Sequence, residues 1–333
     1  MTDPTDASSD AEGSHDVERF MIDNGSGHVL SVRRRRPRKP LPGVAPTVLL
    51  PGYGMNSFIF GFHPAGESLE EYVAARGIET WVADLRGQGA STRTWGREES
   101  TLRDYAIDDV GAVLSAILER TETGERAVNV VGCSMGAALA FGHVAVRPEA
   151  PVRAIVSFAG AVTWRKAHPL VRAAFASPTL AGAVRVKNTR AAARVIFPTL
   201  IKRAPWLLAP YLRAETTDAS RSDEMVQTVE DPSPALNREI ARWIKAKDLV
   251  FDGVNVTHAM RSMRHPVMCI VGNQDGIVPP ETARAPYDEV ASAEKELVCV
   301  GDAREPFAHG DLFVGKGAQE KVFAHLLRFL ARH

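Results

Sequence analysis

The sequence predicts an α/β fold: a mostly parallel central sheet, flanking helices on both faces and a helical cap insertion. Short, continuously apolar segments alternate with amphipathic ones on both sides of about 100 residues of helical character. Continuous apolar strands of this kind are typical of a parallel sheet that is covered on both faces. A Gly-x-Ser-x-Gly stretch at residues 132–136, between an apolar strand and a run of small residues, supports the same fold class.

The first half of the chain alternates strands with helices. We expect strands at residues 29–36, 47–50, 79–85, 127–131 and 152–158. Residues 29–36 alternate poorly and include four consecutive arginines, Arg33 to Arg36, so we expect an exposed edge strand whose charges prevent aggregation. Helices are expected at residues 68–76, at 102–117, and from residue 136 to about Arg147, where Pro148 ends the helix.

The alternation stops near Ala161 and resumes at His265. Residues 161–260 therefore form the predicted helical cap, and residues 17–160 and 261–333 form the sheet-based core. In the second core segment we expect strands at 266–271 and 296–300, and helices at 282–291 and 318–332. The acidic, polar residues 1–16 are predicted to be a disordered tail and do not resemble a signal peptide.

The composition narrows the class of protein. A chain of 333 residues suits one large domain or a core with an insertion. Lysine plus arginine and aspartate plus glutamate each number 40, so bulk charge gives no indication of nucleic-acid binding. No apolar run is long enough to cross a membrane. Three cysteines make no disulfide framework, so we expect buried thiols in a cytoplasmic protein: Cys133, Cys269 and Cys299.

Ser134, at the centre of the 132–136 stretch, is the candidate nucleophile. A buried strand, a sharp turn and a helix are the setting of a nucleophile elbow, and the flanking glycines let strand and helix approach closely. The alternative is a packing turn with a bystander serine. Because a serine hydroxyl is a weak nucleophile at neutral pH, the catalytic interpretation requires a base and an acid that orients it.

Two later loops supply an acid and a base. Asp275 follows the 266–271 strand and His309 follows the 296–300 strand, and ligands bind at the carboxyl ends of parallel strands. The order Ser, Asp, His is the one expected with this elbow. Asp302 is a rival acid, but it follows a glycine and is typical of a turn. The competing histidines are expected to be structural or solvated: His143, His168, His258 and His265.

These motifs together resemble the α/β-hydrolase fold superfamily. The resemblance rests on the elbow, on the Asp-Leu-Arg-Gly-Gln-Gly stretch at 84–89, on Gly-x-x-Asp-x-x-Val-Pro at 272–279 and on His309, and it covers about residues 28–333. It implies Ser134 as nucleophile, His309 as base and Asp275 as the orienting acid. No metal or dinucleotide motif is present in the sequence, so no cofactor is expected.

The resemblance also implies an oxyanion hole. One donor is the backbone N–H of Met135, which follows the nucleophile. The other is the backbone N–H of Tyr53, in the loop after the 47–50 strand. Relatives have a His-Gly pair there and this chain has Pro51-Gly52, so the loop departs from the family pattern. Asp84 and Arg86 are expected to brace the active-site loops and to have no chemical role.

Cys133 invites a thiol mechanism, but it does not occupy the central position of the elbow. Polyhydroxyalkanoate synthases carry cysteine at that central position, and this chain is similar to them and to lipase-like relatives at residues 52–56 and 309–313. A serine at 134 favours hydrolysis of a carboxylic ester over polymer synthesis. Transfer of the acyl group to an alcohol and a non-catalytic binding role stay open as alternatives.

The cap indicates the substrate and the partners. Aromatic residues near the insertion point, Phe158, Trp164 and Phe175, predict an apolar pocket for a lipid-like or medium-length acyl chain over Ser134. Residues 161–213 carry ten basic and no acidic residues, and seven acidic residues follow between 214 and 239. Such a segment has a solvated basic face with its apolar side on the core, or it contacts an anionic membrane surface.

Overall fold

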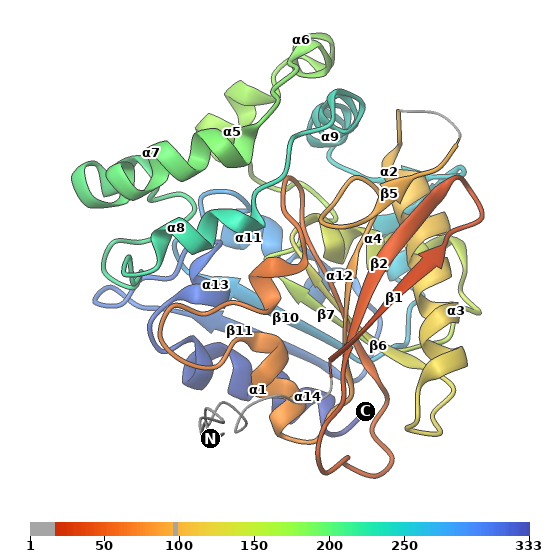
Figure 1. Cartoon of the computed structure of the whole chain (residues 1–333). Helices are drawn as coiled ribbons and strands as arrows, with labels where there is room; N and C mark the ends of the chain where they lie inside the picture. Colours follow the sequence, from red (N-terminus) through yellow and green to blue (C-terminus); the bar gives the residue numbers. More distant parts are fainter. Residues whose placement is uncertain (1–16, 96–98) are drawn as a thin grey trace, which may run out of the picture.

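The computed structural model describes residues 17–95 and 99–333, so the tail predicted at 1–16 lies outside the described residues. A nine-stranded sheet forms the centre, in the order β1-β2-β4-β3-β6-β7-β10-β11, with β5 paired to β2 (Figure 1). Its strands are β1 (Val17–Asp23), β2 (His28–Arg35), β3 (Thr47–Leu50), β4 (Thr80–Asp84), β5 (Thr92–Arg93), β6 (Val128–Cys133), β7 (Val152–Phe158), β10 (Val267–Gly272) and β11 (Lys295–Val300).

The sheet is mostly parallel, as predicted. Strands β4, β3, β6, β7, β10 and β11 pair in parallel, whereas β2 runs antiparallel to β1, β4 and β5. The helices of the core are α1 (Leu69–Ala75), α2 (Leu102–Asp104), α3 (Val110–Arg120), α4 (Met135–Val146), α11 (Pro280–Ala283), α12 (Ala285–Glu289), α13 (Asp311–Val314) and α14 (Ala324–Leu330). Single π-turns join α2 to α3, at Tyr105–Asp109, and precede α14, at Gln319–Phe323.

Alternate side chains of the parallel strands enter two apolar cores. On β10, Val267 and Cys269 pack on the same side as α3, α4 and α10 (Val256–Met260), whereas Met268 and Ile270 pack on the side of α1, α13 and α14. A strand presents successive side chains to opposite faces, so a strand buried on both faces must be apolar throughout. This constraint explains the continuous apolar runs in the sequence.

The prediction that residues 29–36 form an exposed edge strand is wrong. Strand β2 lies between β1 and β4, and β1 is the edge. Its arginines neutralise acidic residues of the core: Arg33 and Arg35 pair with Glu70 of α1, and Arg34 pairs with the buried Glu79. The poor alternation of β2 therefore reflects these ion pairs.

The chain leaves the sheet between β7 and β10. We call residues 161–260 the insertion; it contains α5 (Pro169–Ala174), α6 (Pro178–Ala183), α7 (Thr189–Arg203), α8 (Ser222–Met225), α9 (Pro234–Ala246), the hairpin β8 (Val250–Phe251) and β9 (Val254–Asn255), and α10. Helices α5, α6 and α7 lie in a band at one corner of the molecule (Figure 1). The hairpin was not predicted, because two residues per strand show no periodic pattern.

The end of the insertion returns to the core. Phe251, Val256 and Met260 are buried in the same apolar cluster as α4. A Cβ added at Gly142 of α4 would lie 2.3 Å from the Phe251 ring, so only glycine leaves room for this ring. In the described part of the chain, no helix is both long and apolar enough to span a lipid bilayer.

A buried ion pair fixes the loop after β4. Arg86 Nε and Nη2 donate to the carboxylate of Asp109, whose side chain is fully buried, at 2.7–3.0 Å. Asp109 also accepts from the Arg86 backbone N–H and from Asn24 Nδ2. The contacts anchor the 84–89 stretch to the start of α3, in agreement with the bracing role expected for Arg86.

We predict that Asp109→Ala lowers the free energy of unfolding by about 3–5 kcal/mol, because it leaves the buried Arg86 without its principal partner. The matched control is Asp252→Ala, which breaks the exposed pair with Arg103 at 3.0 Å and should cost less than about 1 kcal/mol. Urea unfolding followed by circular dichroism measures both. Equal losses in the two variants would show that burial of the Arg86 pair has no special weight.

Candidate active site

Ser134 lies between β6 and α4 in a backbone conformation that non-glycine residues rarely adopt. Its φ is 52° and its ψ is −114°. Such a conformation costs roughly 1–3 kcal/mol and persists only where the surroundings hold it. Here the Ser134 N–H donates to the carbonyl of Phe158 on β7 at 2.8 Å, and the Ser134 carbonyl accepts from Ala137 at 3.2 Å. Strand β7 and helix α4 therefore hold the strained turn from both sides.

The two glycines of the elbow are required by close backbone approach. A Cβ on Gly132 would lie 2.2 Å from the backbone nitrogen of Ala137, and one on Gly136 would lie 2.4 Å from the carbonyl oxygen of Leu50. Both obstacles are main chain and cannot rotate away. The sequence pattern around Ser134 is thus the one that this tight strand-to-helix crossing permits.

The structure brings Asp275 and His309 into direct contact. His309 Nδ1 lies 2.6 Å from Asp275 Oδ2, and both side chains are buried. Asp275 Oδ1 accepts from the backbone N–H groups of Ile277 and Val278, each at 2.8 Å. An ionised carboxylate only accepts hydrogen bonds, so this contact favours the ring form of His309 in which Nδ1 donates to Asp275 and Nε2 can accept a hydrogen bond.

The loops that carry Asp275 and His309 are fastened to each other. Asn273 Oδ1 accepts from the Phe307 N–H at 2.9 Å, and the Gln274 N–H donates to the Phe307 carbonyl at 2.9 Å. A Cβ on Gly272 would lie 2.6 Å from that same carbonyl oxygen. These contacts keep the acid and the histidine at a fixed separation.

Asp311, two residues after His309, ties this loop to the insertion. Its carboxylate accepts from the backbone N–H groups of Ala308 and Arg213 and from the hydroxyl of Thr217, at 2.8–3.0 Å. Burial raises the pKa of Asp311 to about 6, so at neutral pH the carboxylate is available as an acceptor. Sequence reasoning gave Asp311 no role, because its partners come from a segment about 100 residues earlier.

The rival acid and histidines lie in other surroundings. Asp302 is exposed, and its carboxylate accepts from the N–H groups of Arg304 and Glu305 in a turn. His143 Nδ1 lies 2.8 Å from the carbonyl of Ala106, and burial lowers its pKa. His168 caps α5, His258 lies in exposed surroundings on α10, and His265 precedes β10.

The loop after β3 places Tyr53 beside Ser134. A Cβ on Gly52 would lie 3.1 Å from Ser134 Cβ, so the Gly52–Tyr53 peptide is close to the elbow. The Gly52 carbonyl accepts from Gln88 Nε2 at 3.1 Å, and Gln88 Oε1 accepts from the Leu85 N–H at 2.9 Å. In a trans peptide the N–H points away from the carbonyl, so Gln88 holds the Tyr53 N–H on the opposite side of this peptide.

Asp84 braces the same loops. Its carboxylate accepts from the Ser57 N–H at 2.8 Å and from the Ala90 N–H at 3.4 Å. Its backbone carbonyl accepts from the Ser91 hydroxyl at 2.7 Å. The 84–89 stretch therefore supports the Tyr53 loop through Asp84 and Gln88 together. Sequence reasoning anticipated the bracing by Asp84 but not the contact made by Gln88.

Ser134 and His309 open into one apolar cavity of about 290 Å³. Most of the side chains that line it are apolar. Met55 and Ile277 come from the core, and six come from the insertion: Ala193, Phe197, Tyr211, Met225, Val226 and Val229. The aromatic residues named for this role from the sequence are not among them. Phe158 stacks on Phe313 in the core, Trp164 packs against Trp243, and Phe175 contacts the ring of Tyr53.

The family model for serine aminopeptidases of the S33 type matches residues 64–304. The chain belongs to this family of hydrolases. It is an enzyme of the α/β-hydrolase class, and the fold predicted from the elbow and its accompanying motifs is confirmed. No curated protein sequence matches the chain.

Solved structures of similar fold include several hydrolases. An esterase from Thermogutta terrifontis aligns with a TM-score of 0.60 at 14% identity, over 95% of this chain and 98% of its own. Rv0554 from Mycobacterium tuberculosis aligns with a TM-score of 0.61 at 21% identity, over 91% of this chain and 94% of its own. A monoacylglycerol lipase from Paleococcus ferrophilus aligns with a TM-score of 0.56 at 18% identity, over 91% of this chain and 99% of its own. Identities this low establish a common fold and leave the substrate open.

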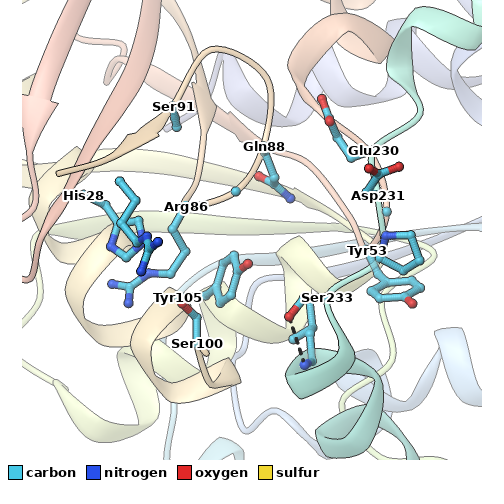
Figure 2. A pocket seen from close by; sticks show the side chains of 15 residues that line it. His28, Tyr53, Arg86, Gln88, Ser91, Ser100, Tyr105, Glu230, Asp231 and Ser233 are labelled. Atoms are coloured by element: carbon cyan, nitrogen blue, oxygen red, sulfur yellow. Dashed lines mark hydrogen bonds between the residues drawn. The ribbon is translucent and has the colours of Figure 1, made fainter. Parts of the chain in front are cut away.

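A second cavity, of about 250 Å³, adjoins the first in this S33-family hydrolase. Tyr53 and Gly54 line both cavities, but the second has a polar lining. Figure 2 shows His28 and Arg86 on one side of it, Glu230 and Asp231 on the other, and Gln88 between them. The hydroxyl of Tyr53 donates to Asn237 on α9, and burial raises its pKa to about 12. The Tyr53 loop is thus the wall between an apolar and a polar compartment.

The cysteines of this hydrolase differ in exposure. Cys133 and Cys269 are buried, and burial raises the pKa of both thiols, that of Cys269 to about 12. Cys299, expected to be buried, is exposed because β11 is an edge strand of the sheet. A thiol with a raised pKa forms little thiolate at neutral pH, so the surroundings of Cys133 oppose a thiol mechanism.

We predict that iodoacetamide modifies Cys299 in the folded protein, whereas Cys133 and Cys269 react only after unfolding in urea, since their thiols are buried and protonated. Peptide mass spectrometry measures the labelled fraction at each site, and Cys299 is the internal control. Rapid labelling of Cys133 in the folded protein would contradict the burial on which this prediction rests.

Proposed function

We propose that this protein is a serine hydrolase that cleaves carboxylic esters with an apolar, lipid-like or medium-length acyl chain through a seryl acyl-enzyme. The observation that carries the proposal is the apolar cavity into which Ser134 and His309 both open, with Asp275 held 2.6 Å behind the histidine. Ser134 serves as nucleophile, His309 as general base and then general acid, and Asp275 as the residue that orients the imidazole.

In the proposed reaction, Ser134 Oγ attacks the ester carbonyl carbon while His309 Nε2 takes the hydroxyl proton. The tetrahedral intermediate then collapses, the bond to the alcohol oxygen breaks, and His309 returns the proton to that oxygen. A water molecule, deprotonated by His309, attacks the acyl-enzyme; the bond between the acyl carbon and Ser134 Oγ then breaks, His309 returns the proton to Oγ, and the carboxylic acid is released. Asp275 stabilises the imidazolium that forms in each half-reaction and keeps Nε2 directed at the reacting atoms.

The oxyanion of each tetrahedral intermediate requires donors that are in place before the reaction. We assign them to the backbone N–H of Met135, the first residue of α4, and to that of Tyr53. The Met135 N–H belongs to a helix N-terminus, where N–H groups lack partners within the helix and favour negative charge. The Gln88 contact to Gly52 supports the Tyr53 assignment, because it fixes the orientation of that peptide.

The cavity supports an ester with an uncharged acyl chain. The family is described by its aminopeptidases, and a substrate with a free ammonium group needs an anionic partner where it is buried. Among the described residues that line the apolar cavity there is no aspartate or glutamate. Phe197 and Ala193 of α7 line the cavity, so we propose that the insertion acts as a cap that determines the acyl chain.

We expect a p-nitrophenyl ester series to give the highest kcat/KM at medium acyl length, because the cavity is apolar and of limited volume. Ser134→Ala should lower kcat by about 10⁴–10⁶, and His309→Ala by a similar factor, since the members act as a unit. Activity restricted to short, polar esters would contradict the acyl pocket, and near-normal turnover of His309→Ala would contradict the triad.

Two further experiments separate the other candidate functions. Product analysis with an added alcohol distinguishes an acyltransferase, which would form a new ester faster than the free acid. Reaction of a fluorophosphonate probe with the wild type but not with Ser134→Ala distinguishes an enzyme from a binding protein on this fold. Failure of the wild type to react would overturn the proposed nucleophile.

We predict that Gln88→Met lowers kcat about tenfold and changes KM less than twofold. Removing a whole oxyanion donor costs about 10²–10³ in kcat, and a donor that is only displaced should cost less. Gln88→Glu, which keeps the acceptor for Leu85 but loses the donor to Gly52, should give a similar loss of kcat. A lowered melting temperature with unchanged kcat in both variants would indicate a purely structural role for Gln88.

A further inference from the structure

The outer surface of the insertion combines exposed apolar side chains with cations that have no acidic partner among the described residues. Of the 13 large hydrophobic residues exposed in the described chain, eight lie between residues 170 and 207. Trp206 is 70% exposed and Val195 is 76% exposed. We call this set the docking face; its apolar members are Leu170, Leu180, Val184, Val186, Val195, Ile196, Trp206 and Leu207.

The cations of the same segment are only partly neutralised. Arg165 and Lys166 pair with acidic residues of α11 and α12, and Arg190 and Arg213 pair with Glu230 and Glu215. Six of the ten basic residues between 161 and 213 have no acidic partner within the described chain: Arg172, Arg185, Lys187, Arg194, Lys202 and Arg203. The acidic residues at 214–239 therefore pair with two of the ten cations, Arg190 and Arg213, and do not neutralise the whole segment, which the sequence had left as an alternative.

Helix α7 connects this surface to the acyl cavity. Ala193 and Phe197, four residues apart, line the cavity, and Ile201 continues the same buried face. Val195, two residues from Ala193 and therefore on the opposite side of the helix, is exposed, and the exposed Lys202 follows it by seven positions. One helix thus separates the docking face from the cavity that contains Ser134.

Three residues of the docking face line one groove, between α5 and the end of α7. Leu170, at the start of α5, lines it together with Trp206 and Leu207, which follow α7. Figure 1 shows α5, α6 and α7 as one band on the outside of the molecule, away from the sheet. The exposed apolar residues thus lie on elements that share one side of the protein.

We propose that the docking face binds the surface of an anionic lipid membrane. Apolar side chains that enter the headgroup region, with lysine and arginine around them, are the composition of an interfacial segment. Tryptophan favours that depth, and each basic residue near a negative leaflet adds attraction that salt weakens. Six cations of this segment have no acidic partner within the described chain, so its charge is complementary to that of an anionic leaflet.

A membrane bound at the docking face would bring a lipid substrate close to the acyl cavity beneath α7. This consequence rests on the proposed function, because it assumes that the acyl cavity receives a lipid chain. The acyl chain of a lipid that leaves the bilayer beside α7 would have only this helix to pass before reaching Ser134. Binding to the membrane itself does not depend on catalysis, so the two can be tested separately.

Vesicle flotation of the full-length protein tests the proposal. We expect at least about tenfold stronger binding to phosphatidylcholine vesicles with about one third phosphatidylglycerol than to phosphatidylcholine alone, and weaker binding in high salt. The combined change Arg172→Gln, Arg185→Gln, Lys187→Gln and Lys202→Gln should abolish the preference for anionic vesicles. Leu180→Ser with Val195→Ser and Trp206→Ser should weaken binding to both, and all seven side chains are exposed, so folding should persist.

A control removes the same number of exposed cations elsewhere, by Lys39→Gln, Arg126→Gln, Arg304→Gln and Lys316→Gln. We expect this control to bind anionic vesicles as the wild type does, and both charge variants to hydrolyse a soluble ester at the wild-type rate. Equal binding to neutral and anionic vesicles, equal losses in the control and the docking-face variant, or a dimer that buries Trp206 would each overturn the proposal. Flotation without esterase activity would instead contradict the proposed function and leave the docking face standing.

Discussion

The backbone at Ser134 is the constraint on which the rest of the site depends. A positive φ at a serine is unfavourable, and it survives here because β6, β7 and α4 fix the turn on both sides. The two glycines of the elbow are a consequence, since the helix begins where its backbone almost touches that of the sheet. The same turn sets Ser134 at the start of α4, where the first N–H groups have no carbonyl partner one turn earlier in the helix. The position of the serine thus follows from strand pairing and helix packing together.

Support for the site comes from side chains that do not line the apolar cavity. Gln88 orients the peptide of Tyr53, Asp84 fastens the neighbouring turn, and Asp311 joins the histidine loop to the insertion. Each of these groups is buried and satisfies backbone N–H or carbonyl groups that would otherwise lack partners. The loops are therefore held by polar contacts within the core edge, which explains how long loop segments keep a defined geometry.

The sequence was sufficient for the parts that depend on local pattern. The parallel strands follow from continuous apolar runs, and Asp275 and His309 were placed in loops at strand ends that the structure brings together. Sequence patterns do not reveal features that depend on contacts between residues far apart in the chain. The arginine run suggested an edge strand, because Glu70 and Glu79, which pair with the three arginines of β2, lie more than 30 residues further along the chain. The acyl cavity was assigned to the wrong aromatics for the same reason, since α7 and α8 reach it only through the fold of the insertion.

The proposed mechanism requires that Ser134 carries the acyl group during turnover. The most direct measurement is rapid mixing with a p-nitrophenyl ester, acid quenching before steady state, and mass spectrometry of the intact protein and its peptides. We expect a mass increase equal to the acyl group, located on the peptide that contains Ser134 and absent from Ser134→Ala. An acyl group on Cys133, or turnover of the ester with the Ser134→Ala variant at the wild-type rate, would contradict it.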